Sequence, residues 1–428
     1  MDRPNASKPR GLISVLRDTT FRSLRHRNYR LYFFGQIVSL TGSWMQSAAL
    51  MWLVYDQTSD PIWPPLMLVA QTAPTLLLGP FGGSLADRFS KRSLIIGTQF
   101  VFLLSSVLLT LLVACDWATP WLLFAVAVGN GCVQSIDLPA RLAYVPDLIP
   151  RDDLINAVSL NAMLFNSARA VGPAMSGGMF LLADWMVAFL PGSRAVTLGA
   201  VWCFALNAIS YTAVLAALRA IDAPESTRTK KSEASVLAGF RYVWERKRLA
   251  ALLFCTFLVS VFGWPTLTLF PPYTKVVLQH SEKEYSLLVS SLGVGALLAA
   301  LTNATFGTPS VARRFLVSGS ILCSLGILGL ALVHTMPAAV LSAAVFGYGM
   351  ILYLSTGQGV LQLSASDDAR GRVMVLWPMT LSGGAVIGHL LSGWAARNIS
   401  ISTLMLLMAA GVGFTAVFMT VLAIRLKR

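Results

Sequence analysis

Charged residues are scarce in this chain. Asp, Glu, Lys and Arg make up 12% of its 428 residues, about half the share in an ordinary soluble domain, while 55% of the residues are hydrophobic. This composition excludes a soluble enzyme, a disordered tail and a nucleic-acid-binding module. The mean hydropathy of +0.67 leaves no room for a large water-soluble domain. We therefore expect most of the protein to lie in a lipid bilayer.

Cysteine is also scarce. The five cysteines are far apart in apolar runs, and the chain shows no Cys-x-x-Cys or Cys/His metal spacing. We expect no structural disulfide, no metal site and no cofactor, and we expect no enzymatic activity because no constellation of His, Cys, Ser and carboxylates converges. Residues 1–29 are polar and basic, and the apolar run after them is too long for the core of a signal peptide.

Long apolar runs dominate what is present. Twelve of them are long enough for a helix to cross a bilayer, and backbone polar groups in lipid must be satisfied within a segment, which favours helices. The sequence thus predicts an all-α integral membrane protein with twelve transmembrane helices. The expected spans are residues 30–55, 62–86, 93–114, 118–140, 154–183, 196–218, 249–275, 285–306, 315–335, 337–361, 371–396 and 401–424.

The net charge of +14 is explained by topology. If the N-terminus lies inside, 28 of the 33 Lys and Arg residues fall on the tails and on the loops of the same side. This is the positive-inside bias of a multi-pass plasma-membrane protein with both termini in the cytoplasm. The basic excess requires no nucleic-acid partner.

The longest polar stretch divides the chain into two sets of six spans. We predict a cytoplasmic N-terminal segment, two six-helix halves, a cytoplasmic linker with an amphipathic helix, and a short cytoplasmic tail. The linker helix begins near Ser235, and a structural tether between the halves is favoured over a partner-binding site. These parts are residues 1–29, 30–218, 219–248, 249–424 and 425–428.

The two halves show weak internal repetition. A shift of about 216 residues superposes Gly172 and Gly177 of the fifth span on Gly388 and Gly393 of the eleventh. Duplicated six-helix halves place a substrate site near the bilayer midplane, between the halves, and move substrate by alternating access. Small residues also allow close helix packing, so Gly172, Pro173, Gly177, Gly178, Gly388 and Gly393 are expected at helix contacts.

The loop after the second span carries a recognisable motif. Gly83-Ser-Leu-Ala-Asp87-Arg88-Phe-Ser-Lys91-Arg92 resembles the G-x-L-A-D-R-x-G-R-K motif of the major facilitator superfamily. Further segments, including Asp137-Leu-Pro-Ala-Arg141 and Arg370-Gly-Arg372-Val, resemble its branch of enterobactin exporters and macrolide efflux proteins, the transmembrane secretion effectors. The resemblance implies the twelve-helix major facilitator fold and export of small molecules.

The resemblance also implies a conformational latch, in which Asp87 holds the first half against the start of span eleven. An acid near a helix start contributes roughly 0.3 to 1 kcal/mol, enough to bias a conformational equilibrium. The alternative is a solvated charged turn that only sets topology. The residues assigned to the latch are Gly83, Asp87, Arg88, Lys91, Arg92, Arg141, Arg370 and Arg372.

Arg169 lies near the middle of the fifth span, where an unpaired cation costs at least roughly 2.5 kcal/mol. It must face a watery cavity, helix backbone and amide groups, or a substrate anion. Asn166 lies one turn before it and Asn161 lies further back, so a polar stripe is expected on this helix. A substrate contact and a purely structural role remain alternatives.

Tryptophan and glutamine residues mark a candidate cavity. Trp44, Gln46 and Gln36 lie on span one and Trp264 lies on span seven, where they are expected to line a substrate cavity. Packing and membrane-interface roles are the alternatives for these aromatic residues.

Proton coupling requires a titratable group in the pathway. His389 on span eleven has an unperturbed pKa suited to protonation cycles, with a helix-packing role as the alternative. Asp137 and Asp56 are the other candidates, both nearer the membrane faces. No cofactor is expected to take part in transport, and a proton gradient is the energy source considered.

The sequence therefore predicts a monomeric secondary transporter that exports a small amphipathic or anionic molecule, siderophore-like or drug-like, by alternating access, with proton antiport as the coupling considered. A lipid or lysolipid flippase of the same fold is the alternative within transport. A transport-like receptor that binds a ligand without moving it is the alternative of another class.

Overall fold

The computed structural model describes residues 21–189, 194–222, 236–366 and 373–425. Within them the chain is helical, and ten helices are long and apolar enough to cross a membrane. Two more, α3 and α16, have 26 and 20 residues and contain proline and glycine. The first six long helices are α2 (Arg27–Thr58), α3 (Trp63–Arg88), α4 (Lys91–Ala114), α5 (Pro120–Tyr144), α6 (Leu154–Val187) and α7 (Ala195–Ala220).

Six further long helices follow the linker, which the structure describes from the short helix α8 onward. α8 has an exposed Trp244 and a buried Val243, the pattern of a helix lying at a membrane surface. The bounds are α8 (Val236–Trp244), α9 (Lys247–Gly263), α10 (Pro265–Thr268), α11 (Phe270–Pro272), α12 (Glu282–Phe306), α13 (Ala312–Leu332), α14 (Met336–Ser364), α16 (Leu376–Ala395) and α17 (Ile401–Arg425).

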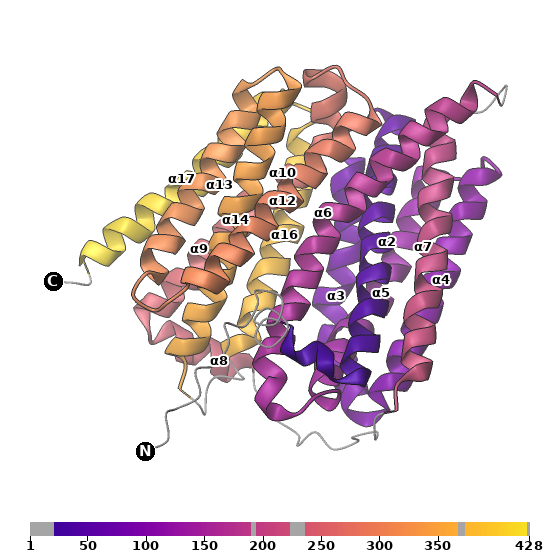
Figure 1. The fold of residues 1–428 in the computed structure, drawn as a ribbon. Coiled ribbons are helices and arrows are strands. Elements are labelled where there is room, and N and C mark those ends of the chain that lie inside the picture. Colours follow the sequence, from indigo (N-terminus) through magenta and orange to yellow (C-terminus); the bar gives the residue numbers. More distant parts are fainter. Residues whose placement is uncertain (1–20, 190–193, 223–235, 367–372, 426–428) are drawn as a thin grey trace, which may run out of the picture.

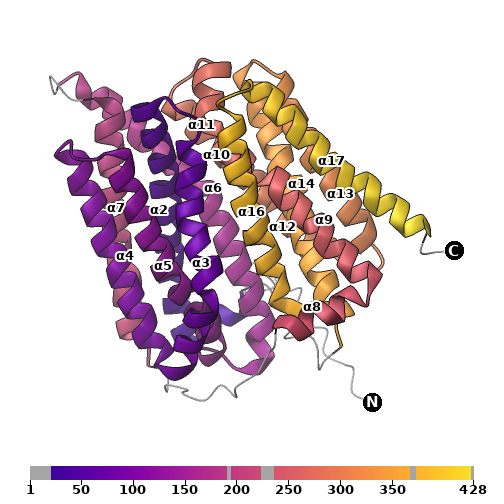
Figure 2. The same ribbon diagram turned by 180° about the vertical axis from the view of Figure 1, so that it is seen from behind.

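The long helices form two packed sets. α2 packs on α6 and α7, and α3 packs on α5, whereas α14 packs on α12 and α13, and α9 packs on α16. The sets meet where α6 contacts α12 and where α3 contacts α16, as Figures 1 and 2 show from opposite sides. We call them the first set (α2 to α7) and the second set (α9 to α17).

Local sequence determines several helix ends. The Thr119 hydroxyl accepts a hydrogen bond from the Leu122 N–H at the start of α5, and Ser281 and Glu284 form a capping box at the start of α12. The predicted seventh span, 249–275, is not one straight helix. It divides at Pro265 into α9, α10, α11 and a π-helical turn, because proline cannot donate a backbone hydrogen bond.

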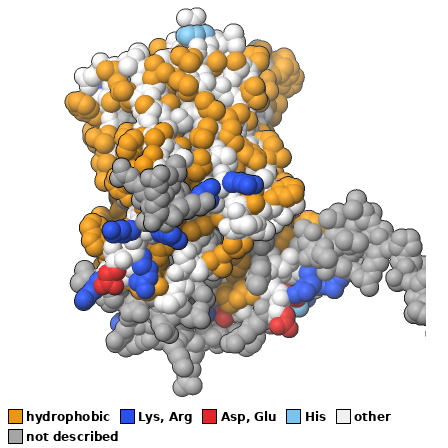
Figure 3. Space-filling view, turned by 90° about the vertical axis from the view of Figure 1, so that its left-hand side faces the viewer, with side chains coloured by type: hydrophobic (Ala, Val, Ile, Leu, Met, Phe, Trp, Pro, Cys, Tyr) orange, Lys and Arg blue, Asp and Glu red, His pale blue; other side chains and the backbone are white. Residues whose placement is uncertain are grey.

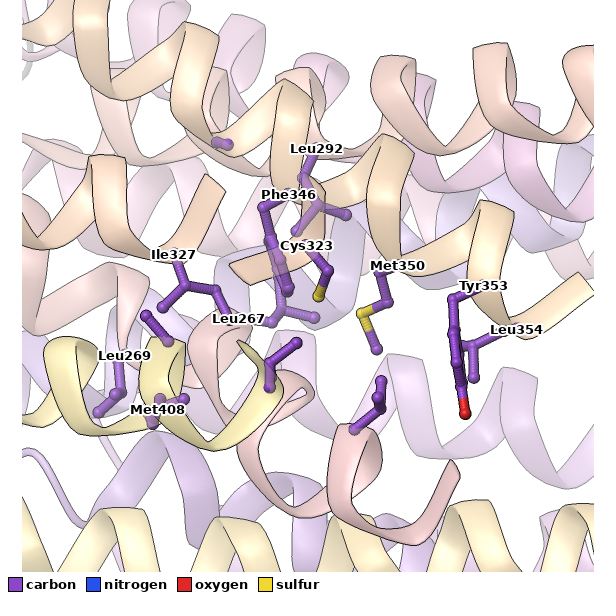
Figure 4. Packing of buried hydrophobic residues seen from close by; sticks show 14 of the residues in the cluster. Leu267, Leu269, Leu292, Cys323, Ile327, Phe346, Met350, Tyr353, Leu354 and Met408 are labelled. Atoms are coloured by element: carbon purple, nitrogen blue, oxygen red, sulfur yellow. The ribbon is translucent and has the colours of Figure 1, made fainter. Parts of the chain in front are cut away.

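The surface and the interior agree with a membrane protein. On the face in Figure 3, apolar side chains cover the upper part, and charged side chains gather in the lower part. The interior of the second set is densely apolar: Leu292, Phe346, Met350 and Leu267 interdigitate there, and Figure 4 shows them at close range. The second set therefore has little interior space.

Candidate functional site

A cavity of about 450 Å³ lies inside the molecule. Of the side chains that line it, Trp264 and Leu267 come from the second set and the others from α2 to α7. The wall is mostly neutral and polar, and Arg141 is the one charged side chain among the described lining residues. Its amides and small hydroxyls are Gln36, Ser39, Ser43, Gln46, Ser47, Gln71, Thr72, Thr75, Gln99, Asn130, Gln134 and Asn161.

Five of the residues expected to line a cavity do so. Gln36, Trp44 and Gln46 of α2 face it together with Asn161 of α6 and Trp264. Sequence reasoning missed Gln71, Gln99, Asn130 and Gln134, which belong to α3, α4 and α5. Each of them is a polar amide inside an apolar span, which is a signal of a buried polar site. A single sequence does not show which face of a helix points inward, so the signal could not be assigned to the cavity.

Arg169 is buried behind the cavity wall, and its side chain is 4% exposed. It donates a hydrogen bond to Asn166 Oδ1 at 2.5 Å. Its guanidinium carbon lies 5.7 Å from the ring centre of Trp44 and 5.8 Å from that of Phe165, within the range of cation–π attraction. Trp44 and Phe165 both line the cavity, so two aromatic rings stand at its wall beside this cation.

A buried carboxylate also lies next to the cavity lining. Asp137 is fully buried, and its Oδ1 accepts hydrogen bonds from Thr98 Oγ1 at 2.7 Å and Gln99 Nε2 at 2.9 Å. The guanidinium of Arg141 lies 2.6 Å from Asp137 Oδ2. Arg141, assigned to the latch by resemblance, is thus part of the cavity wall. Its spacing of four residues from Asp137 on one helix was a signal of this pairing.

The same arginine orients a glutamine. Arg141 Nη1 donates to Gln36 Oε1 at 3.0 Å, so the other end of this amide, Nε2, is the donor end. Gln36 is 1% exposed, and its Nε2 is buried without a hydrogen-bond partner among the described residues. Buried donors are rarely left unpaired. Gln36 is one of the lining residues, so this unused donor lies just behind the cavity surface.

The other proton-coupling candidates lie away from the cavity lining. His389 is buried between α16 and α10, with Nδ1 3.3 Å from Thr268 Oγ1. Asp56 lies near the end of α2 and forms an ion pair with Lys275 at 2.7 Å. Of the three candidates, Asp137 is the one joined to the cavity wall through Arg141 and Gln99.

Three ion pairs join the two sets at the end of the bundle opposite the described N-terminal residues. Asp56 contacts Lys275, Asp184 contacts Lys283, and Asp60 contacts Arg397. We call these the end pairs. Arg397 Nε donates to Asp60 Oδ1 at 2.9 Å, and hydrogen bonding from Arg397 lowers the pKa of the Asp60 carboxyl.

The latch residues are only partly described. Lys91 forms an ion pair with Asp147 at 2.8 Å, and Arg92 donates to the carbonyl oxygens of Leu218 and Arg219. These partners all belong to the first set. Gly83 faces open space and Arg88 is exposed. The side chain of Asp87 and the residues Arg370 and Arg372 lie outside the described part of the structure.

The glycines take different places. A Cβ at Gly177 would lie 2.9 Å from Ser286 Cβ of α12, and one at Gly393 would lie 3.1 Å from Ile62 beside α3. Both positions are contacts between the sets. Gly172, which precedes Pro173 in α6, instead fits against Trp44 of α2, and Gly388 fits against Val261 of α9, whereas Gly178 faces open space.

Comparisons with known proteins agree with this architecture. A family model described as transmembrane secretion effector matches residues 18–428. Macrolide efflux protein A of Streptococcus pyogenes is 24% identical over 396 residues, 88% of this chain and 92% of that protein. The enterobactin exporter of Shigella boydii serotype 18 is 24% identical over 389 residues, 87% and 86% of the two chains.

A solved structure of a POT family transporter in complex with 5-aminolevulinic acid has the same fold. Its TM-score is 0.72 at 13% identity, and the match covers 94% of this chain and 97% of that chain. The fold predicted from the apolar runs is confirmed.

Proposed function

The chain belongs to the transmembrane secretion effector family of the major facilitator superfamily, and we propose that it exports small amphipathic molecules by alternating access. It is a membrane transporter, and not an enzyme, because its family and its structural neighbours are transporters. The observation that carries the export proposal is the polar cavity inside the bundle. Relatives named as a macrolide efflux protein and an enterobactin exporter support the direction.

The position of the cavity supports loading from the side of the termini. Along α2 the lining extends from Tyr32, five residues after the helix begins, to Leu50, eight residues before it ends. The end pairs hold the two sets together beyond that point. With both termini in the cytoplasm, as the charge bias favours, a molecule enters from the cytoplasm and leaves after the end pairs separate.

Proton coupling through Asp137 is part of the proposal. Protonation would remove the charge that holds Arg141, and Arg141 in turn holds Gln36 at the cavity wall. A proton on Asp137 and a molecule in the cavity would therefore influence each other through one chain of contacts. His389 is assigned a packing role and Asp56 a role in the end pairs.

The remaining roles follow the same scheme. Asp87, with Arg370 and Arg372, is proposed to close the cytoplasmic side when the end pairs are open. Arg169 is proposed to position Trp44 and Phe165 at the cavity wall. We propose that the transporter works as a monomer in the bacterial inner membrane.

Inside-out vesicles with and without an imposed pH gradient test the proposal. Uptake of uncharged, anionic and cationic amphipathic compounds is measured by mass spectrometry, with vesicles lacking the protein as the control. Gradient-dependent uptake supports antiport. Movement of a fluorescent lipid would support the flippase instead, and thermal stabilisation by a compound without uptake would support the receptor.

A further inference from the structure

We infer that the cavity selects an uncharged ligand with hydroxyl, ether or carbonyl oxygens beside an aromatic or apolar face, and that the first set supplies nearly all of the recognition. This inference deepens the proposed export function and rests on the same cavity. It concerns the class of ligand that binds, whichever way that ligand is moved.

The one charge that lines the cavity is already balanced. Arg141 is the one charged side chain among the described lining residues, and Asp137 neutralises it at 2.6 Å. Arg169 does not line this cavity: it lines a much smaller neighbouring space, with its guanidinium carbon 5.7 Å and 5.8 Å from the ring centres of Trp44 and Phe165 and its Nε without a partner among the described residues. A charged ligand within the larger cavity would leave water without meeting an unpaired opposite charge in its lining, which is unfavourable in a low-dielectric site.

The polar groups of the wall suit neutral oxygen atoms. The contact from Arg141 leaves Gln36 Nε2 as a buried donor without a partner among the described residues. Gln46 Oε1 accepts from Ser106 Oγ at 2.8 Å and from Asn207 Nδ2 at 2.9 Å, which likewise leaves its Nε2 as the donor end. Both glutamines line the cavity with their oxygen ends engaged by neighbouring side chains, so their Nε2 groups are the donors left for a ligand acceptor. Gln36 Nε2 is buried, so its amide has to turn toward the ligand to reach it.

The second set contributes only two side chains, both largely apolar. Trp264 and Leu267 reach the cavity from it. Behind them Leu292, Phe346 and Met350 leave a space of only about 10 Å³, and they lie together with Leu267 in Figure 4. Among the described lining residues, the amides and hydroxyls all belong to α2 to α7, and the indole N–H of Trp264 is the one donor that the second set can add.

Three glycosides of one fluorophore test the charge rule. The 4-methylumbelliferyl β-glucoside is uncharged, the β-glucuronide is an anion, and the β-glucosaminide is a cation when its amine is protonated. Binding of each to the purified full-length protein in nanodiscs is measured by fluorescence titration at pH 6. We expect the glucoside to bind at least about tenfold more tightly than either charged glycoside. Tighter or equal binding of a charged glycoside, or no binding of the glucoside, would overturn the inference.

Two substitutions test the residues. Asp137→Asn leaves the Arg141 cation without its counter-charge, so the preference should move toward the glucuronide by about tenfold or more, while thermal unfolding shows that the protein is folded. Gln36→Leu should weaken glucoside binding by about tenfold, and Gln57→Leu, at an exposed position of the same helix, should leave it unchanged. An unaltered order of preference in Asp137→Asn, or equal effects of the two leucines, contradicts the assignment.

Binding and flux separate the two proposals. If the protein binds the glucoside selectively but moves no compound, the inferred ligand class is supported and the proposed export is contradicted. If the protein exports compounds but prefers the glucuronide, export is supported and the inferred ligand class is contradicted.

Discussion

At the scale of single residues, the sequence predicted where an unusual side chain lies but not what surrounds it. The depth of Arg169 followed from its position in an apolar run, because helix rise is constant. Its partners did not, since Trp44 belongs to another helix and the rotation of each helix about its axis is set by packing. The same reason left Gln99 and Gln134 unnoticed while Gln36 and Gln46 were identified.

Arg169→Gln should lower transport at least about tenfold without lowering the melting temperature. The substitution removes a cation that is buried beside an amide and two aromatic rings, with no carboxylate contacting it among the described residues. The free-energy cost of burying that charge disappears, while about 0.5 to 2 kcal/mol of cation–π attraction is lost, so stability should not fall. Vesicle uptake and thermal unfolding measure the two effects. Arg313→Gln, at an exposed position, is the control. Normal transport with reduced stability would show that Arg169 serves packing alone.

At the scale of helices, number and type were predictable and shape was not. Each of the twelve apolar runs corresponds to a long helix in the described part of the structure, and ten of these helices are long and apolar enough to cross a membrane, because a bilayer demands about 20 residues per span. The break in the seventh span at Pro265 depends on how the following segment packs. Proline within a run indicates a kink but does not determine how far the helix continues after it.

The contact between α6 and α12 should tolerate no added side chain. A Cβ at Gly293 would lie 2.4 Å from Ala170 Cα, so Gly293→Ala should destabilise the protein by about 1 to 3 kcal/mol. Gly97→Ala, where nothing lies within 4 Å of the added carbon, should be neutral or up to about 1 kcal/mol stabilising. Thermal unfolding in one detergent compares them. Equal melting temperatures for the two variants would mean that α6 and α12 do not pack as closely at Gly293 as the structure shows.

At the scale of the whole molecule, charge bias predicts that both termini lie in the cytoplasm, whereas nothing in the sequence predicts the end pairs. Asp60 and Arg397 are 337 residues apart, and no local pattern joins them. The asymmetry of the cavity was also hidden, because the two halves resemble each other in apolar pattern and differ in which side chains fill their interiors.

The link between Asp60 and Arg397 should not respond to pH between about 8 and 5. The pKa of Asp60 is lowered by its hydrogen bond from Arg397, so the stabilisation is present above the ordinary carboxyl pKa of about 4 and is lost only as pH falls below that value. Maleimide labelling of Gln46→Cys from outside, in a protein whose Cys115 and Cys132 are replaced, reports opening at that end when each rate is divided by the rate of a free thiol at the same pH. Labelling that rises on going from pH 7.5 to pH 5.5 in this variant, but not in one that also carries Asp60→Asn, would contradict the assignment.

A reducible cross-link across the end pairs should stop transport reversibly. In a protein whose Cys115 and Cys132 are replaced, Asp56→Cys and Lys275→Cys can be joined by a bifunctional methanethiosulfonate reagent, whose spacer replaces the length of the native side chains that meet at 2.7 Å between Lys275 Nζ and Asp56 Oδ1. We expect the cross-link to abolish uptake into vesicles and reductant to restore it. Each single cysteine variant, treated in the same way, is the control. Full activity of the cross-linked pair would show that this end does not have to open.

The direction of transport is the central claim, and vesicles of defined orientation test it most directly. Inside-out and right-side-out vesicles containing the same amount of protein are supplied with the same panel of amphipathic compounds, and uptake is measured by mass spectrometry. The account predicts accumulation in the inside-out vesicles and none above background in the right-side-out vesicles. Accumulation confined to right-side-out vesicles would contradict it.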